Sequence, residues 1–307
     1  MKQDFATEDL KVELERSLGF RLRSLRRIGG GCAVNFRAVR DGDGFAFSVK
    51  CSPFERKELF GHLVRHLADL KGSKSVQRVF EKECPPVFRG YNVLCLAWCD
   101  GERRFPDRLS AEELSAFLDD YLAFSSAMQK TAEIFPSLPL GSMRKTALGN
   151  CRGLGGRIVR RLIDELIPEE DAAYAADRMR VIHGDLHPGN FLFADGRVVG
   201  FLDLEELRTG YPAEDLVRYF TFAAERLRWR PLRSRRTLRQ FAQAVRHLPY
   251  PADEWRVALV RSLLWKIWPY VSAKPPGVIR ALNLAFRARL CRNLRHIVRR
   301  EMGPVPN

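Results

Sequence analysis

The segment from Val181 to Phe193 constrains this chain more than any other part of its sequence. Within it the acid Asp185 precedes the amide Asn190 by five residues, and Pro188 and Gly189 stand between them. A regular helix cannot form there, because proline lacks an amide donor and glycine favours turns. The apolar residues at both ends of the segment are typical of short buried strands. We therefore predict a loop whose two ends are held in the core.

A second acid, Asp203, ends another apolar run thirteen residues after Asn190. The turn residues Asp195 and Gly196 separate this run from the apolar residues that follow Asn190. Two strands joined by a tight turn form a hairpin, which brings its two ends together. The sequence therefore predicts that Asp203 returns to the side of Asn190.

An acid, an amide and a second acid in this order suit phosphoryl transfer. That reaction requires Mg²⁺ to neutralise the phosphates, oxygen ligands to hold the metal, and a carboxylate near the attacking hydroxyl. We expect Asn190 and Asp203 to bind Mg²⁺, and Asp185 to receive or orient the proton of the hydroxyl.

Two other interpretations of this segment compete with that one. In the first, the segment is an ordinary loop rich in turn residues that carries the acid and the amide by chance, and Asp185 forms a hydrogen bond within its own turn. In the second, His183 and His187 bind zinc. Their spacing suits a metal only if both lie on one face of a helix, and the glycines and the proline exclude a helix here. We expect His183 to orient the loop.

His183-Gly184-Asp185, followed by Asn190 and the strand-borne Asp203, resembles the catalytic core of the aminoglycoside phosphotransferase and choline kinase group, relatives of the eukaryotic protein kinases. Gly184 replaces the arginine of protein kinases, which indicates a small-molecule kinase. Asp203-Leu204-Glu205 replaces Asp-Phe-Gly, so we expect no protein-kinase-style flipping switch there.

The resemblance also implies a fold and its domain organisation. The fold is α+β and has two lobes, with MgATP in the cleft. A small, antiparallel β-rich lobe for nucleotide binding is expected over residues 1–99. A larger, mainly helical lobe for catalysis and acceptor binding is expected over residues 100–307.

The first fifty residues predict short elements separated by turns. We expect a helix over 7–18, strands over 22–28, 33–39 and 45–51, and a glycine turn at Gly29, Gly30 and Gly31. Glycines let main-chain N–H groups approach phosphates closely, although an ordinary turn has the same composition. We expect this turn to bind the nucleotide because a lysine-bearing strand follows it.

Lys50 lies on that strand, which resembles the kinase Val-Ala-Ile-Lys strand with Ser48 in place of the alanine. Alternation places Phe45, Phe47 and Val49 on a bulky, core-facing side, and small residues on the other side leave room for a flat base. The resemblance implies that Lys50 steadies the α- and β-phosphates. The alternative is a solvated lysine near the end of a strand.

A helix is predicted directly after this strand, because Ser52-Pro53-Phe54-Glu55 provides an N-cap, a first-turn proline and a capping-box acid. Kinases pair the strand lysine with a glutamate of this helix. Glu55 and Glu58 are both candidates, and the sequence does not decide between them.

An apolar strand over 91–99 corresponds to the end of the small lobe in the family. The resemblance implies that the main chain of Ala97, Trp98 and Cys99 binds the edge of the adenine. A plain buried strand before a turn would have the same pattern.

Helices are predicted through the rest of the chain. A capping box at Ser110–Glu113 begins a helix that runs to Lys130. The segment Thr209–Tyr219 resembles the family's Gly-x-Pro-x-x-Asp-Leu segment, in which Asp215 would cap a helix and brace the catalytic loop. Further helices are expected over 157–166, 169–179, 237–246, 253–270 and 278–300, and a turn or a mobile substrate loop over 149–156.

The formal net charge of +15 is concentrated near the end of the chain, where nineteen Arg and Lys stand against two acids between Arg226 and Arg300. Such a surface attracts anions, including phosphorylated sugars and anionic lipid head groups. We expect an anionic acceptor and peripheral contact with an anionic membrane through the Arg-rich C-terminal helices, and a merely solvated face is the alternative. The chain has no recognisable nucleic-acid-binding motif, so we expect no nucleic-acid partner.

The chain starts without the apolar core of a signal peptide, and no apolar run reaches the roughly eighteen residues of a membrane span. Its seven cysteines include no Cys-x-x-Cys pair and are typical of reduced thiols. We expect a cytoplasmic protein.

Together these patterns predict an ATP-dependent kinase that phosphorylates a hydroxyl group of a small molecule or sugar. Kinases of lipopolysaccharide core sugars resemble this chain in combining a His-Gly-Asp loop with a basic body, so an anionic or lipid-linked sugar is the preferred acceptor. An aminoglycoside-type or choline-type kinase is the alternative, although a polycationic acceptor requires acids that the helices after Arg226 hardly supply. The non-enzyme alternative is a pseudokinase, or a basic scaffold that binds nucleic acid or a membrane, without the transfer.

Overall fold

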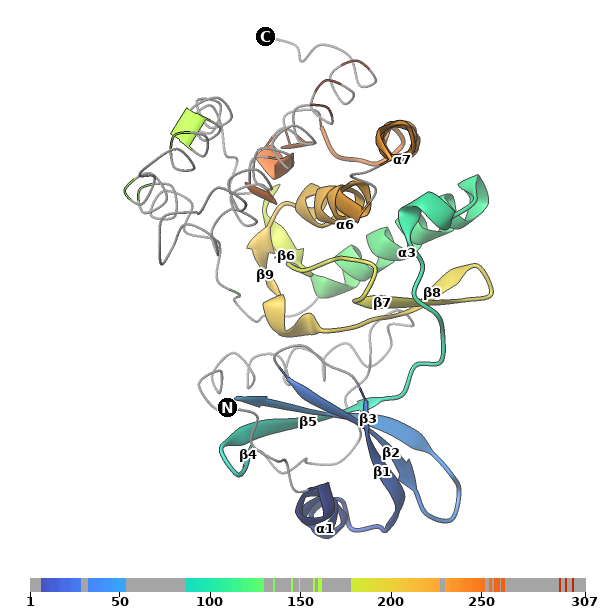
Figure 1. Cartoon of the computed structure of the whole chain (residues 1–307), viewed down its shortest axis with the longest axis vertical. Helices are drawn as coiled ribbons and strands as arrows, with labels where there is room; N and C mark the ends of the chain where they lie inside the picture. The colour runs from blue at the N-terminus through green and yellow to red at the C-terminus, as the bar shows by residue number, and fades with distance from the viewer. Residues whose placement is uncertain are drawn as a thin grey trace. The chain divides into compact units, whose positions relative to one another are not determined.

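The computed structural model describes two compact units of the chain (Figure 1). One unit comprises Met1–Glu102, Ser126–Glu133 and Leu192–Glu205, and the other comprises Arg103–Ser125, Ile134–Phe191 and Glu206–Asn307. The described residues are 7–28, 33–53, 87–129, 135, 145, 149, 157, 160–161, 178–226, 230–251, 254–255, 257–259, 261–262, 293, 296 and 300.

The first unit contains a five-stranded antiparallel sheet with the strand order β1-β2-β3-β5-β4. Its strands are β1 (Leu22–Ile28), β2 (Val34–Arg40), β3 (Ala46–Pro53), β4 (Val87–Phe88) and β5 (Tyr91–Ala97). These bounds confirm the strands predicted over 22–28, 33–39 and 45–51 to within two residues. The helix start predicted at Ser52 and Pro53 was wrong, because both residues continue β3 and pair with β5. The predicted glycine turn at Gly29, Gly30 and Gly31 lies outside the described residues, as do Glu55 and Glu58.

Helix α1 (Thr7–Leu18) covers one face of this sheet (Figure 1). Leu10, Leu14 and Leu18 recur at helical spacing, and all three are fully buried. They share a core with Phe36, Ala38, Phe47, Val49, Cys51, Phe88, Val93 and Cys95 of the strands. The helix predicted over 7–18 is therefore confirmed, and its apolar stripe gives the sheet one buried face.

The side chains of β3 alternate between the two faces of the sheet as predicted, and only the prediction for Phe45, which precedes the strand, differs. Phe47 and Val49 are fully buried in the core, whereas Ser48 and Lys50 alternate with them on the opposite face. The prediction for Phe45 was wrong, because this side chain is 41% exposed. Phe45 precedes the strand, and its N–H donates to Asp43 in the turn.

Strands β7 (Phe191–Ala194) and β8 (Arg197–Phe201) form the hairpin predicted between Asn190 and Asp203. Asp195 and Gly196 have φ angles of 50° and 74°. Positive φ at both central residues is the geometry of the two-residue hairpin turn whose twist matches that of the strands. Glu102 pairs with Phe193 by two main-chain hydrogen bonds, so the segment after β5 is fixed to this hairpin.

The second unit is mainly helical and contains most of α3 (Ala111–Met128), α6 (Pro212–Arg226) and α7 (Pro231–Val245). Two short strands, β6 (Arg180–Ile182) and β9 (Arg208–Gly210), pair antiparallel, and single 3₁₀ turns occur at η2 (Pro106–Arg108) and, across the unit boundary, at η4 (Leu204–Glu206). The capping box of α3 is confirmed, because Glu113 N–H donates to Ser110 Oγ and Ser110 N–H donates to Glu113 Oε2.

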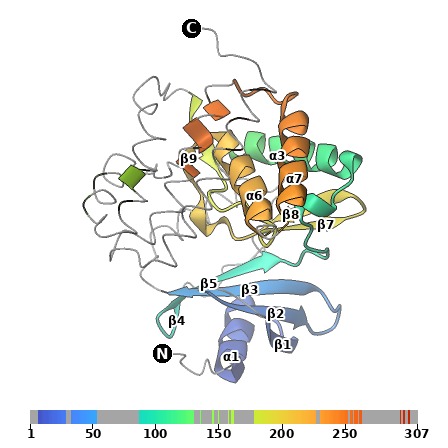
Figure 2. The same cartoon turned by 45° about the horizontal axis from the view of Figure 1, so that its top comes forward.

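Aromatic side chains fill the core of the second unit, and α6 runs beside α7 over this core (Figure 2). The Phe220 ring stacks on Phe241, and Tyr219 contacts Phe117 and Phe191. Helix α7 starts at Pro231, six residues before the predicted start at Thr237, since proline is well suited to the first turn of a helix.

Several predictions fall outside the described residues. They are the helices over 157–166 and 169–179 except for single residues, the segment 150–156, most of the helix over 253–270, and almost all of the Arg-rich helix over 278–300. In the part of the chain that is described, every helix is too short or too polar to cross a bilayer.

Candidate active site

The loop from His183 to Asn190 begins at a glycine that no other residue can replace. Gly184 has φ of 79°, and a Cβ at this position would overlap the main-chain oxygen of Glu206 and come within 2.5 Å of Arg208 Nη1. Glycine is therefore required at this position for two reasons. Its φ lies in the left-handed region, and there is no space for a Cβ.

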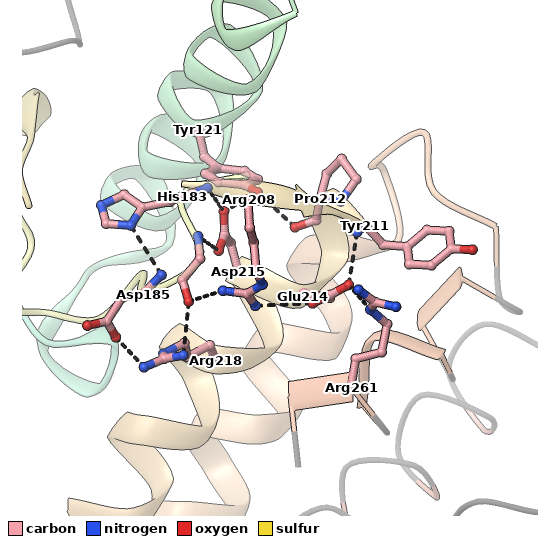
Figure 3. Close-up of polar contacts among 11 residues, drawn as sticks. Tyr121, His183, Asp185, Arg208, Tyr211, Pro212, Glu214, Asp215, Arg218 and Arg261 are labelled. Atoms are coloured by element: carbon pink, nitrogen blue, oxygen red, sulfur yellow. Dashed lines mark hydrogen bonds and ion pairs between the residues drawn. The ribbon is translucent and has the colours of Figure 1, made fainter. Parts of the chain in front are cut away.

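Asp215 holds the N–H groups at the start of the loop (Figure 3). Its buried carboxylate accepts hydrogen bonds from His183 N–H at 2.7 Å and Gly184 N–H at 2.9 Å, and from the Tyr121 hydroxyl at 3.1 Å. Burial raises the pKa of Asp215, and the neighbouring His183 and Arg208 and the two N–H groups oppose this rise. The predicted brace of the catalytic loop is confirmed.

The predicted role of Asp215 as a helix cap was wrong. Helix α6 is capped by Glu214, whose Oε1 accepts the N–H of Tyr211 at 3.0 Å. The carboxylate of Asp215, one residue later, points to the loop and not to the end of the helix (Figure 3). A glutamate three residues into a helix reaches back to the capping residue more easily than an aspartate does.

Two arginines hold the carbonyl group of the same glycine. Arg208 Nη1 and Arg218 Nη1 both donate to Gly184 O, the latter at 2.9 Å. Arg208 also pairs with the buried Glu214 at 3.2 Å, and Arg261 pairs with the same carboxylate. The N–H of Gly184 is thus held by an acid, and its carbonyl oxygen by two cations.

His183 is fully buried, and its Nδ1 accepts the N–H of Asp185 at 3.3 Å. Its ring lies 6.0 Å from that of Phe124. These contacts confirm the prediction that His183 orients the loop.

The carboxylate of Asp185 is 22% exposed and has different neighbours at its two oxygens. Oδ1 pairs with Arg218 Nη2, and Oδ2 lies 3.8 Å from His187 Nε2. The His187 ring stacks on Phe222 with centroids 5.1 Å apart, and its Nδ1 accepts Gly189 N–H at 3.0 Å. Acceptance at Nδ1 places the ring proton of neutral His187 on Nε2, the nitrogen that faces Asp185.

The nearly buried Asn190 closes the loop back onto Asp185. Its Nδ2 donates to the main-chain oxygen of Asp185 at 3.0 Å, and its N–H donates to the main-chain oxygen of His187 at 2.8 Å. Because the amide nitrogen is used in this bond, the amide oxygen is the atom suited to a hard cation.

In the first unit, Lys50 forms ion pairs with two acids that follow β8. Its Nζ pairs with Asp203 and lies 3.4 Å from Glu205 Oε1. Ser52 Oγ donates to the same Glu205 oxygen, and both of these side chains are buried. Asp203 has φ of 58°, which a non-glycine residue rarely adopts, and its side chain is partly exposed.

Other residues predicted to bind the nucleotide also belong to the first unit. Ser48 Oγ donates to the main-chain oxygen of Leu96 at 3.3 Å. Ala97, Trp98 and Cys99 are half-buried, and the guanidinium of Arg37 lies 4.9 Å above the Trp98 ring. Burial and the nearby Asp100 raise the pKa of the Cys99 thiol.

Sequence reasoning missed Arg208, Arg218 and Glu205. Arg218 stands three residues after Asp215, so helical spacing places both on one face of α6, and this signal was available. Glu205 stands two residues after Asp203, but its contact with Lys50 depends on tertiary structure and has no local signal.

The residues present fit a magnesium ion bound together with phosphates. Within the described ranges no three His, Cys, Asp or Glu side chains form a closed metal cage. Mg²⁺ characteristically binds through one or two protein carboxylates and substrate phosphates, and it does not require such a cage. The amide oxygen of Asn190 in the second unit and the carboxylate of Asp203 in the first unit, which pairs with the Lys50 ammonium, each have the chemistry of such a ligand.

Comparison with known proteins gives one family and a consistent fold. The model of the phosphotransferase enzyme family matches residues 24–258. The uncharacterized protein YcbJ of Bacillus subtilis (strain 168) is 43% identical over 58 residues, which are 19% of this chain and 19% of that protein. The match therefore spans about a fifth of the length of this curated relative.

Two solved structures show the same fold at low sequence identity. An aminoglycoside phosphotransferase from Alicyclobacillus acidocaldarius has a TM-score of 0.62 at 16% identity, with 94% of both chains covered. The amicoumacin kinase hAmiN, in complex with AMP-PNP, Ca²⁺ and Ami, has a TM-score of 0.61 at 13% identity, with 94% of this chain and 96% of that chain covered. The predicted α+β, protein-kinase-like fold class is confirmed.

Proposed function

This chain belongs to the phosphotransferase enzyme family, and from this premise we propose that it transfers the γ-phosphoryl group of ATP to a hydroxyl group of a small-molecule acceptor. The observation that carries the proposal is the loop around Asp185. Its backbone is fixed by Asp215, Arg208 and Arg218, while the Asp185 carboxylate itself stays accessible to a ligand.

In this proposal Asp185 orients the attacking hydroxyl and receives its proton. The bond between Pγ and the oxygen it shares with ADP breaks, the bond between Pγ and the acceptor oxygen forms, and the proton passes through Asp185 to solvent. Little covalent chemistry is required of the protein, so positioning and charge neutralisation supply most of the rate. The several contacts that hold Gly184 and His183 serve that positioning.

Lys50 steadies the phosphates, with Glu205 as its carboxylate partner. Ser48 and the main chain of Ala97, Trp98 and Cys99 surround the adenine. Asn190 and Asp203 hold Mg²⁺, which when bound neutralises phosphate charge. In the structure Asp203 pairs with the Lys50 ammonium.

For the acceptor we propose a sugar hydroxyl on an anionic or lipid-linked molecule, such as a lipopolysaccharide core sugar, used at the cytoplasmic face of a membrane. Support comes from the net charge of +15 and from the nineteen basic residues against two acids between Arg226 and Arg300. Such a surface attracts anionic molecules at low ionic strength and loses this attraction as salt rises. An antibiotic acceptor is the second candidate, because the two solved structures above are named for aminoglycoside and amicoumacin kinases.

The test is a transfer assay with ATP labelled at the γ-phosphate. Phosphorylated sugars and lipid-linked sugars form one arm, and aminoglycosides and choline form the other, with Asp185→Asn as the inactive control. We expect transfer in the first arm, and a rate that falls as salt rises. Transfer only to aminoglycosides or choline, or activity insensitive to salt, would overturn the acceptor assignment, and equal activity of Asp185→Asn would overturn the proposed mechanism.

A further inference from the structure

Helix α6 places Arg218 beside the loop that carries Asp185. Arg218 Nη1 donates to Gly184 O at 2.9 Å, and Nη2 pairs with Asp185 Oδ1 (Figure 3). The planar fork of one guanidinium therefore joins the main chain of the loop to the side chain that follows it. The Arg218 side chain is only 16% exposed, and burial lowers its pKa while Asp185 opposes this change.

Arg208 contacts the same Gly184 oxygen as Arg218 but differs in its second contact. It donates to the same Gly184 oxygen, but its other terminal nitrogen turns away to Glu214. Asp215 already holds the N–H groups of His183 and Gly184. Asp215 and Arg208 thus hold the backbone of the loop together with Arg218, and Arg218 makes in addition the contact with the Asp185 carboxylate.

We propose that Arg218 is a positioning residue for Asp185, and this inference rests on the proposed phosphoryl transfer. Arg218 binds Oδ1 and thereby directs Oδ2, which lies on the side of His187, toward the acceptor hydroxyl. Without this contact the carboxylate would be held less firmly, because His187 Nε2 lies 3.8 Å from Oδ2. A misplacement of about 1 Å can cost about 100-fold in rate, so the contact has a large effect on turnover.

The test uses hydrolysis of MgATP by the full-length protein, with water as the phosphoryl acceptor, so that no acceptor needs to be identified. Arg218→Met is expected to lower turnover about 100-fold. Arg218→Lys is expected to recover part of the rate, since an ammonium reaches Asp185 but cannot also hold Gly184 O as a fork does. The matched control is Arg16→Met, which removes a 75% exposed arginine paired with Glu13 and should leave turnover unchanged.

Chemical rescue separates positioning from folding. Guanidinium chloride at millimolar, non-denaturing concentrations should raise the turnover of Arg218→Ala and leave that of Asp185→Asn unchanged. Wild-type turnover in Arg218→Met, a loss fully explained by a smaller folded fraction, or an absence of rescue would each overturn the role of Arg218.

Failure of the proposed function has a different signature. It appears as wild-type protein without any ATP turnover, or as Asp185→Asn with full turnover. In that case crystal structures of the wild type and of Arg218→Met still test whether Arg218 positions the Asp185 carboxylate. A rotated Asp185 carboxylate in the variant supports it, and an unchanged carboxylate overturns it.

Discussion

At the scale of single residues, Gly184 has both a conformation and a space that exclude other side chains. Its φ of 79° lies in the left-handed region, and its Cα faces the main-chain oxygen of Glu206. The loop that presents Asp185 therefore passes closer to the neighbouring chain than an alanine would allow. The close approach also brings the Gly184 carbonyl within reach of Arg208 and Arg218.

Substitution of Gly184 by alanine should destabilise the protein strongly. Strain at a left-handed non-glycine residue costs about 1–3 kcal/mol, and the overlap with Glu206 adds to it, so we expect a total loss of about 3 kcal/mol or more. Gly196→Ala is the matched control, because Gly196 also has positive φ but an alanine Cβ there would meet nothing within 4 Å. Chemical denaturation measures both variants, and equal losses would show that the close contact has no effect.

Two cysteines of the first unit should differ in reactivity. Burial raises the pKa of Cys51 to about 12, so almost no thiolate forms at pH 8, and the native protein should protect Cys51 from alkylation. Cys99 is half-buried, so it should react before Cys51, and its rate should rise with pH because its pKa is also raised.

Peptide mass spectrometry after iodoacetamide treatment distinguishes these two sites from the other cysteines. If the proposed function is correct, ATP should slow alkylation of Cys99 because the main chain there binds the adenine. Faster labelling of Cys51 than of Cys99 in the native protein would contradict the burial of Cys51.

At the scale of elements, the start of α6 combines a helix cap with a buried charge cluster. Glu214 is 1% exposed, accepts the N–H of Tyr211 and pairs with Arg208 and Arg261. Its negative charge also lies in the first turn, where the helix dipole favours it. The helix that carries Asp215 and Arg218 therefore has its first turn anchored from several directions.

Replacing Glu214 by glutamine keeps the shape of the side chain but removes the carboxylate that pairs with the buried Arg208 and Arg261. Breaking a buried ion pair in this way costs about 3–5 kcal/mol. Ser110→Ala, which removes the N-cap of α3, is the comparison and should cost about 1 kcal/mol. Urea denaturation of both variants measures the difference, and a Glu214→Gln loss no larger than that of Ser110→Ala would contradict the importance of the cluster.

How well the elements and the site were predicted depends on the range of the forces involved. Helix α1, the strands of the sheet and the hairpin turn at Asp195 follow from local periodicity and turn preferences, which act over a few residues. The predicted start of α7 and the predicted burial of Phe45 were wrong, because both depend on the exact residue at which an element begins. The contact of Lys50 with Glu205 joins distant segments, so no local pattern could predict it. For Arg218 the spacing from Asp215 on α6 did offer a signal, although its contact with Asp185 also joins distant segments.

At the scale of the whole molecule, the proposed chemistry requires side chains from separate segments of the chain to act on one substrate. Asn190 ends the loop of Asp185, whereas Asp203 follows the hairpin and pairs with Lys50. Binding of a phosphate-bound cation at Asp203 would release Lys50 to meet the phosphates. Nucleotide and metal should therefore stabilise the folded protein together and not independently.

Thermal denaturation tests this coupling directly. A ligand present at about 100 times its Kd stabilises the folded state by about 2.7 kcal/mol, so MgATP should raise the Tm of the wild type clearly. Removal of Mg²⁺ with EDTA should reduce the shift that ATP produces. Asn190→Ala and Asp203→Asn should each lose the Mg²⁺-dependent part, since each removes one proposed oxygen ligand.

Asp43→Asn is the control for these variants, because Asp43 forms an exposed ion pair with Arg40 away from the proposed ligands. It should retain the wild-type shift with MgATP. An ATP shift that does not depend on Mg²⁺, or an unchanged Mg²⁺ response in both Asn190→Ala and Asp203→Asn, would show that these residues do not hold the metal. Loss of the response in only one of the two variants would assign the metal to that residue and remove the other from the site.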